Sequence, residues 1–263
     1  MTETPAQLEH ILDELDSLDL ESLGQVRLMD REDTKFVFHE DQLPEVIHGL
    51  ANRFRVLEID RRRQFLYRTR YLDTPDLRFY LDHHNGLRPR IKIRYRQYEN
   101  PAATYFEVKV KGNRNRTRKM RMPAREMGDT PGPDETTFLQ EHLPTVPATL
   151  SRSLDVRFQR FTLVNRHEPD RITVDTDLEV LHGDHWQKFP DLVIAEIKQP
   201  RYRPSSRFIQ TMRKISIHEM RLSKYCLGIL MTHRGIRYNR FKPKLMRLNT
   251  LLDTQQYTEV LYA

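Results

Sequence analysis

Two charged, alternating segments constrain the fold of this chain more than any other feature. The first reads RIKIRYR from residue 90, and the second reads FEVKVK from residue 106. Successive side chains of a strand point to opposite faces, so each segment predicts a strand with one charged and one apolar face. Paired as a hairpin, the two strands place six cations and one carboxylate on a single surface: Arg90, Lys92, Arg94, Arg96, Lys109, Lys111 and Glu107.

The charge on such a surface must be compensated, because like charges that face each other across strands repel. A solvated face is the ordinary interpretation of one isolated strand of this kind. Here the alternation recurs at residues 34–39, 116–121, 171–177 and 192–199. The recurrence favours a surface whose charge is neutralised by a bound polyanion, and therefore predicts phosphate binding.

The remaining pattern indicates an α+β protein with at least seven strands, mostly antiparallel because their connections are short. Further strands are predicted at 64–73 and 154–165, a loop at 83–86, and helices at 44–54, 134–142, 206–217 and 222–231. A barrel or sandwich with an apolar interior fits this periodicity. A closed barrel with a charged interior and an apolar exterior covered by helices fits it equally well, so the pattern leaves both open.

The two ends of the chain differ in charge. Apolar residues at helical spacing predict an acidic amphipathic helix over 5–21, which is either an ordinary surface helix or a lid over the basic residues. Residues 233–247 hold six Lys or Arg and no acid, which predicts a solvated tail or a contact with an acidic partner. The formal net charge is +7, and residues 1–21 hold seven acids and no Lys or Arg, so the remainder carries +14. A body of this charge favours anionic partners.

Composition excludes several classes of protein. The single cysteine, Cys226, excludes an internal disulfide and a cysteine-based zinc site. No apolar run reaches the ~20 residues that span a bilayer, and no secretion signal is visible. A cytoplasmic location is therefore expected. Within the apolar segment LVIAEIKQ at 192–199, Glu196 and Lys198 form a charged pair that is costly to bury without partners, which makes them candidate site residues.

Seven short motifs occur in the order seen in a known family: TKF at 34–36, YLDTP at 71–75, RIKIRY at 90–95, FEVKVK at 106–111, RITVDTD at 171–177, AEIK at 195–198 and LSKY at 222–225. On these motifs the chain resembles the vacuolar transporter chaperone (VTC) domain, the polyphosphate polymerase domain of the CYTH-like, triphosphate tunnel metalloenzyme superfamily. The resemblance implies an antiparallel β-tunnel of about eight strands with a basic interior. It also implies transfer of the γ-phosphate of ATP to a growing polyphosphate chain, with Mn²⁺ or Mg²⁺. The implied division is an N-terminal helix over 1–24, the tunnel domain over 25–235 and a basic tail over 236–263.

The resemblance also implies roles for individual residues. The catalytic set is Lys92, Arg94, Lys109, Arg160, Arg171 and Lys224. The phosphate-binding set is Lys35, Arg90, Lys111, Lys119, Arg121, Lys198 and Ser223, with Lys119 and Arg121 as alternatives for one tunnel position. Glu196 corresponds to the metal-binding carboxylate. The chain departs from the yeast-type domain at Lys111, where that domain has histidine, and at Phe158, where it has tyrosine.

Three functions follow as alternatives. The first is the polymerase, with ATP and polyphosphate as partners. The second is a tunnel triphosphatase; the superfamily's hydrolases begin with Glu-x-Glu-x-Lys, and Arg31 replaces the first of those acids here. The third is a binding module for polyphosphate or RNA. RNA recognition usually adds exposed aromatic rings, and Tyr95 and Phe106 fall on the face opposite the cations, so no nucleic acid is expected.

Overall fold

The computed structural model describes residues 5–25, 32–112 and 117–259, and these form two compact units. The first unit comprises Met1–Leu66, Phe158–Leu178 and Phe189–Leu222, and the second comprises Tyr67–Arg157, Glu179–Lys188 and Ser223–Ala263. Arg31 and Arg116, which the sequence analysis used, lie outside the described residues.

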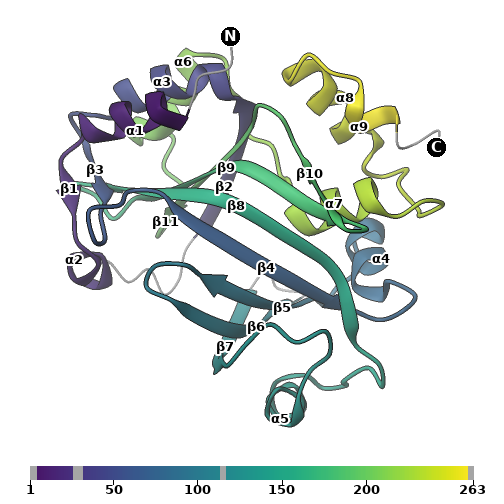
Figure 1. The fold of residues 1–263 in the computed structure, drawn as a ribbon. Helices are drawn as coiled ribbons and strands as arrows, with labels where there is room; N and C mark the ends of the chain where they lie inside the picture. Colours follow the sequence, from purple (N-terminus) through teal and green to yellow (C-terminus); the bar gives the residue numbers. More distant parts are fainter. Residues whose placement is uncertain (1–4, 26–31, 113–116, 260–263) are drawn as a thin grey trace. The chain divides into compact units, whose positions relative to one another are not determined.

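The first unit contains α1 (Pro5–Asp13), β1 (Ser17–Leu18), α2 (Leu20–Gln25), β2 (Glu32–His39), the 3₁₀ turn η1 (Glu40–Gln42), α3 (Leu43–His48), β3 (Phe54–Leu57), β11 (Leu192–Gln199) and α6 (Arg207–Lys214). The second contains α4 (Arg78–Asn85), β5 (Arg90–Tyr98), β6 (Ala103–Lys111), β7 (Thr117–Ala124), α5 (Pro133–His142), β10 (His185–Lys188), α7 (Lys224–Thr232), α8 (Lys242–Leu251) and α9 (Gln256–Glu259). Three strands have residues in both units: β4 (Phe65–Asp73), β8 (Ser151–Asn165) and β9 (Arg171–His182). Figure 1 shows these elements along the chain.

The strand order is β2-β11-β9-β8-β4-β5-β6-β7, and the short strands β1, β3 and β10 bring the sheet to eleven strands. The ladders β2–β11, β11–β9, β4–β5, β5–β6 and β6–β7 are antiparallel, as predicted. The expectation of a closed barrel of about eight strands is wrong in both respects. No ladder within the described residues joins β2 to β7, so the sheet is not closed. The additional strands were not predicted because segments of two to four residues are too short to show a period.

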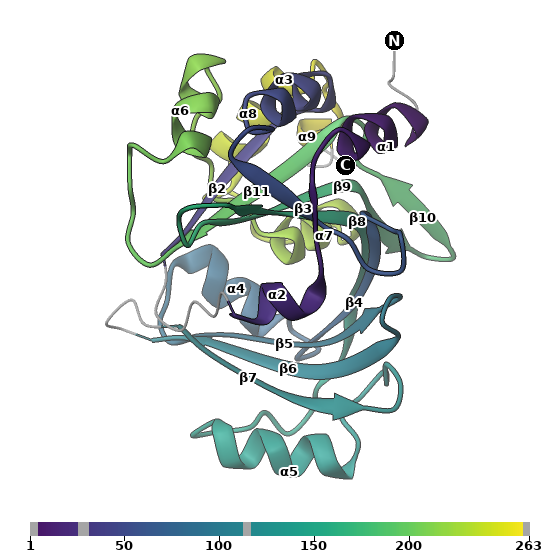
Figure 2. The same ribbon diagram turned by 90° about the vertical axis from the view of Figure 1, so that its left-hand side faces the viewer.

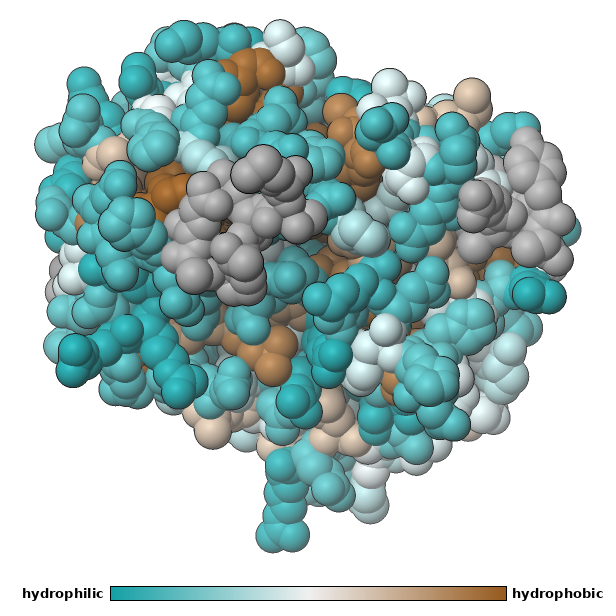
Figure 3. All heavy atoms as spheres, turned by 45° about the horizontal axis from the view of Figure 1, so that its top comes forward, coloured by the Kyte–Doolittle hydropathy of each residue, from teal (hydrophilic) through white to brown (hydrophobic). Residues whose placement is uncertain are grey.

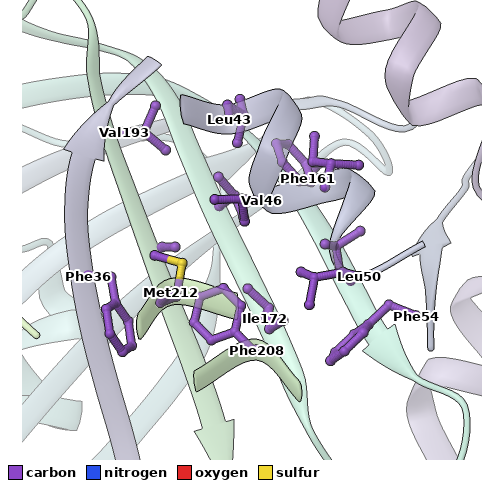
Figure 4. Close-up of a cluster of buried hydrophobic side chains, with 14 of the residues drawn as sticks. Phe36, Leu43, Val46, Leu50, Phe54, Phe161, Ile172, Val193, Phe208 and Met212 are labelled. Atoms are coloured by element: carbon purple, nitrogen blue, oxygen red, sulfur yellow. The ribbon is translucent and has the colours of Figure 1, made fainter. Parts of the chain in front are cut away.

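The core of the first unit lies between one face of its strands and helices α1, α3 and α6 (Figures 1 and 2). Figure 4 shows Phe36 of β2 and Ile172 of β9 packed with Val46 of α3 and Phe208 of α6. Phe208 and Val46 are fully buried. Helices therefore cover the apolar face of this unit, and the charged residues that alternate with the core residues occupy the other face.

The second unit repeats this arrangement. Ile93, Phe106 and Val108 of β5 and β6 pack with Leu139 of α5 on one face of the strands. The opposite face carries the cations. In each unit, taken by itself, helices cover the apolar face of the strands and the charged residues lie on the opposite face.

The N-terminal segment differs from its prediction. Residues 5–21 do not form one helix: α1 ends at Asp13, and Ser17–Leu18 pairs in parallel with β3. Arg63 fixes this end by donating hydrogen bonds to the carbonyls of Leu12 and Leu15. The arginine thus bonds to the carbonyl of Leu12 in the last turn of α1 and to that of Leu15 just after the helix, where the chain turns into β1.

Two further segments are more ordered than predicted. His83 and His84, predicted in a loop, belong to the last turn of α4, because the buried carboxylate of Asp73 accepts hydrogen bonds from the N–H groups of Phe79 and Tyr80 and so anchors this helix. Residues 242–259, predicted as solvated tail, contain α8 and α9.

The face in Figure 3 is mostly hydrophilic, with hydrophobic side chains in separate spots. Large apolar side chains that are well exposed within the described residues are Leu20, Leu87 and Met246. No described helix has the length and apolar character needed to span a membrane.

Candidate functional site

The charged face of the second unit contains the hairpin that the sequence predicts, formed by β5 and β6. Arg90 lies opposite Lys111, Lys92 opposite Lys109, and Arg94 opposite Glu107. The third strand adds Lys119 opposite Lys109 and Arg121 opposite Glu107. Lys109, Lys119 and Arg121 are exposed, whereas Arg90, Lys92, Arg94 and Lys111 are partly buried. The face thus brings most of the predicted phosphate ligands together on three adjacent strands.

One buried carboxylate organises this face. Glu107 is 1% exposed, and its Oε2 accepts hydrogen bonds from Arg94 Nε at 2.8 Å and Nη2 at 2.6 Å. Its other oxygen lies 2.5 Å from Lys119 Nζ. Burial raises the pKa of Glu107, but the charges of Arg94, Arg96 and Lys119 outweigh burial and hold that pKa far below its ordinary value. Glu107 is therefore ionised and holds Arg94 and Lys119 in place.

Lys119 itself is perturbed. Although its side chain is 39% exposed, the protein packed around its ammonium lowers its pKa to about 8, with a contribution from Arg94, while Glu107 favours the charged form. Arg121 lies on the same face but rests on the Tyr105 ring, with its guanidinium carbon 4.6 Å from the ring centroid. Of the two alternatives for one tunnel position, Lys119 is the one bonded to Glu107, and Arg121 is directed to an aromatic ring.

Aromatic rings also share this face, which the sequence analysis overlooked. Tyr95 and Phe106 do lie on the apolar face. Tyr98 and Tyr105, however, lie on the same face as the cations, and Tyr98 packs edge-to-face on Tyr67 at 4.9 Å. The period-two pattern contained this signal, since both tyrosines are in phase with Arg94 or Glu107.

Ser223 joins the charged face to helix α7. Its hydroxyl oxygen accepts a hydrogen bond from Lys92 Nζ at 2.8 Å. The same oxygen accepts from the N–H of Cys226 at 3.3 Å and so caps the helix. Lys224 is the first residue of α7 and is partly buried. The LSKY motif therefore forms a helix start that contacts a cation of β5.

The first unit has a second charged face, built by β2, β11 and β9. Lys35 lies opposite Glu196, which in turn lies opposite Thr173. Lys198 lies opposite Asp33 on one side and Arg171 on the other. All of these alternate with core residues, so they share the face away from α1, α3 and α6.

Glu196 lies between two lysines. Lys35 Nζ forms an ion pair with its Oε2, and Lys198 Nζ lies 3.3 Å from its Oε1. Burial raises the pKa of Glu196, but Lys198 and Lys35 hold it well below its ordinary value. Burial lowers the pKa of Lys198 to about 8, although Glu196 favours its charged form. The carboxylate is therefore ionised, with a lysine ammonium beside each of its oxygens.

Arg160 is oriented by a carboxylate in the same way as Arg94. Asp175 is 3% exposed and accepts a bidentate pair of hydrogen bonds, at 2.5 Å from Arg160 Nε and 2.8 Å from Nη2. The Arg160 guanidinium also lies over the Phe158 ring, 5.2 Å from the centroid. Sequence reasoning missed the roles of Glu107, the one acid in phase with the lysines of β6, and of Asp175, which shares its phase on β9 with Asp177 and Glu179.

The donor chemistry of the first unit fits a divalent metal held by few protein ligands. Glu196 and Asp33 offer carboxylate oxygens from adjacent strands, and Asp33 also lowers the pKa of Glu196. Within the described residues no group of three or more His, Cys, Asp or Glu side chains is placed to hold a metal. Mg²⁺ or Mn²⁺ commonly takes one or two carboxylates and completes its shell with water and substrate phosphates, so the set suffices in the presence of a polyphosphate.

The positions of these charged residues coincide with a family match. The VTC domain family matches residues 30–233, which is most of the chain. The protein belongs to the VTC domain family. Both charged faces lie within the VTC match, and residues 234–259, with α8 and α9, follow it.

Solved structures with similar folds share little sequence with this VTC domain. A Hippeastrum protein, HpAC1, described as having a dominant triphosphatase activity, is 11% identical with a TM-score of 0.45, and the match covers 76% of this chain and 95% of that one. A conserved hypothetical protein from Pyrococcus furiosus is 12% identical with a TM-score of 0.41, over 74% and 99% of the two chains. PH1819 from Pyrococcus horikoshii is 15% identical with a TM-score of 0.41, over 76% and 95%. A comparison with curated proteins gave no match.

Proposed function

We propose that this VTC-family protein is a polyphosphate polymerase, which transfers the γ-phosphate of ATP to the end of an inorganic polyphosphate chain. The observation that carries the proposal is the cation face of the second unit, in which a buried glutamate holds Arg94 and Lys119 among further cations. Phosphoryl transfer needs positioning and neutralisation of charge more than it needs covalent help from the protein. A fixed array of Lys and Arg supplies both.

Each type of cation has its own task in this proposal. Arg94 and Arg160 present planar guanidinium groups that Glu107 and Asp175 keep in one orientation, and such groups grip two phosphate oxygens at once. Lys92, Lys109 and Lys119 act as point charges on a polyanion bound at the face of the second unit. Because Ser223 holds Lys92 through a hydrogen bond, its ammonium is positioned before substrate arrives. Lys35, Arg90, Lys111, Arg171, Lys198 and Lys224 supply the remaining charge.

In the reaction, a terminal phosphate oxygen of the polymer forms a bond to the γ-phosphorus while the bond from that phosphorus to the β–γ bridging oxygen breaks and ADP leaves. The acceptor is an anionic phosphate oxygen, so no side chain has to act as nucleophile or remove a proton. Glu196, with Asp33, would hold Mn²⁺ or Mg²⁺, which when bound neutralises charge on the phosphate oxygens.

The proposal is tested by supplying the purified protein with ATP and Mn²⁺ and resolving the products on a gel. We expect polymer to accumulate with ADP. Glu196→Ala should reduce turnover by about a hundredfold or more, since the metal would lose its principal carboxylate. Glu126→Ala, which removes an exposed carboxylate outside both faces, is the matched control and should retain activity.

Two other outcomes reject the proposal. Free phosphate without polymer would identify a triphosphatase. Tight polyphosphate binding with no turnover of ATP, in wild-type protein and Glu196→Ala alike, would identify a binding module.

A further inference from the structure

A strongly basic segment follows the part of the chain that the VTC family matches. The match ends at residue 233, and residues 234–247 carry six cations and no Asp or Glu: Arg234, Arg237, Arg240, Lys242, Lys244 and Arg247. Roles assigned to VTC residues therefore do not account for this concentration of charge.

The segment is folded rather than loose. Helix α8 buries Leu245 and Leu248, which are 1% and 0% exposed. The ring of Phe241 packs on Tyr80 and His84 of α4, with centroids 6.0 and 5.4 Å apart. Apolar and aromatic contacts thus attach the segment to α4, and most of its cations lie on the exposed side of this folded segment.

Backbone hydrogen bonds fix the segment further. The Tyr80 hydroxyl donates to the carbonyl oxygen of Arg237 at 2.6 Å, and the N–H of Arg240 donates to His84 Nε2 at 3.2 Å. The Arg240 guanidinium donates to the carbonyl oxygen of Asn85, at the C-terminal end of α4. Arg240 therefore has a structural contact, and Lys244 Nζ lies over the Phe241 ring, 5.8 Å from its centroid.

The charge of the segment is left largely uncompensated by the protein. All six cations except Lys244 are exposed. In the described part of the chain no carboxylate pairs with Arg234, Arg237, Lys242 or Arg247. The first turn of α8 contains Lys242 and Lys244 but no acid, although the positive end of a helix dipole favours acids there. A bound polyanion would relieve this repulsion.

The segment adjoins the cation face within the same unit. Helix α4, on which it packs, leads directly into β5 at Arg90. His83 of α4 contacts the Phe241 ring, with centroids 6.1 Å apart. Burial lowers the pKa of His83 to about 2, and Lys92, Arg90 and Lys244 add to the effect, so cations of β5 and of α8 act on the same imidazole.

We propose that residues 234–247 bind the part of a long polyphosphate chain that extends beyond the phosphates held by β5 and β6. The identity of the polymer rests on the proposed function; the charge and position of the segment do not. Each Lys or Arg that contacts a phosphate releases counterions, so both the affinity and its salt dependence increase with the number of contacts. RNA fits the segment less well because Phe241 is buried and Tyr238 half-buried, which leaves little ring surface for stacking bases.

The test uses the full chain and a variant with three exposed cations neutralised, Arg234→Gln, Lys242→Gln and Arg247→Gln. Affinities for long-chain polyphosphate and for tripolyphosphate are measured over a range of salt concentrations. We expect the variant to bind the long chain about tenfold or more weakly, with the slope of log affinity against log salt reduced by about two, as loss of three phosphate contacts predicts. Its affinity for tripolyphosphate should change less than about twofold.

A control variant removes the same charge elsewhere: Arg62→Gln, Arg213→Gln and Lys214→Gln, three exposed cations of the first unit. An equal loss of long-chain binding in this control would overturn the inference, because net charge alone would then explain the effect. Unchanged long-chain binding in the first variant, an equal loss of tripolyphosphate binding, or RNA binding as tightly as polyphosphate of equal charge would also overturn it. Failure of the proposed function would appear separately, as absence of polymer synthesis by the wild-type protein.

Discussion

At the scale of single residues, three carboxylates have the same role: Glu107, Asp175 and Glu196. Each is a carboxylate paired with at least one arginine or lysine, whose side chain it keeps in one place. Removal of such a carboxylate leaves a cation without its partner, so these acids matter to the proposed function although phosphate itself would never contact Glu107.

Lys119 gives a prediction about pH. Its pKa in the folded protein is about 8 instead of 10.5, so it loses its charge as the pH rises through this region. We expect the affinity for tripolyphosphate to fall above about pH 8, more steeply in wild-type protein than in Lys119→Arg, because arginine stays charged. Binding titrations of both proteins from pH 7 to 9.5 check this, and identical pH profiles would contradict it.

The lowered pKa of Lys119 also makes the free energy of unfolding depend on pH. Between about pH 8 and 10.5 the unfolded chain binds more protons at Lys119 than the folded chain does. The contribution of Lys119 to the free energy of unfolding therefore rises with pH in this window and is smallest below it.

At the scale of elements, Ser223 connects the start of α7 to β5. Ser223→Ala should lower the free energy of unfolding by about 1 kcal/mol, since the helix loses its N-cap. Ser223→Asp retains a capping oxygen but places a carboxylate beside Lys92, so it should preserve stability and weaken tripolyphosphate binding. Urea unfolding and binding measurements separate the two effects; an alanine variant as stable as wild type would remove the capping role.

Helix α1 is part of the core of the first unit. Leu12 is 1% exposed, and Leu12→Ala should lower the free energy of unfolding by about 3 kcal/mol. Glu9→Ala on the exposed side of α1 is the control and should change stability little. A lid that only covers the basic residues predicts the reverse: stability unchanged in Leu12→Ala, with altered kinetics.

At the scale of the whole molecule, sequence predicted elements wherever a charged or apolar period ran for five residues or more. β2, β5, β6 and β11 were expected close to where they occur, because alternation over a strand fixes both its existence and its faces. The predicted hairpin of β5 and β6 is confirmed. α8 was missed because its cations hide the spacing of Leu245 and Leu248. The last turn of α4 was predicted as a loop because the carboxylate that anchors the helix, Asp73, lies five residues before the helix begins.

The candidate site was predictable to the same extent. Cations are visible in sequence as members of an alternating strand. Their carboxylate partners are not, because alternation does not show which residues face each other across strands; Glu196 and Lys35, for example, lie 161 residues apart in the chain. Whether the acceptor is a phosphate or water depends on positions of substrate atoms that no residue pattern encodes.

The first experiment should therefore identify the acceptor of the γ-phosphate. The wild-type protein is supplied with ATP and divalent metal in water enriched in ¹⁸O, and the label in all phosphate products is determined by mass spectrometry. Transfer to a polyphosphate acceptor predicts ADP and polymer without ¹⁸O incorporated during turnover. One ¹⁸O atom in each inorganic phosphate released, in amounts equal to ADP, would show that water accepts the γ-phosphate and would contradict the polymerase.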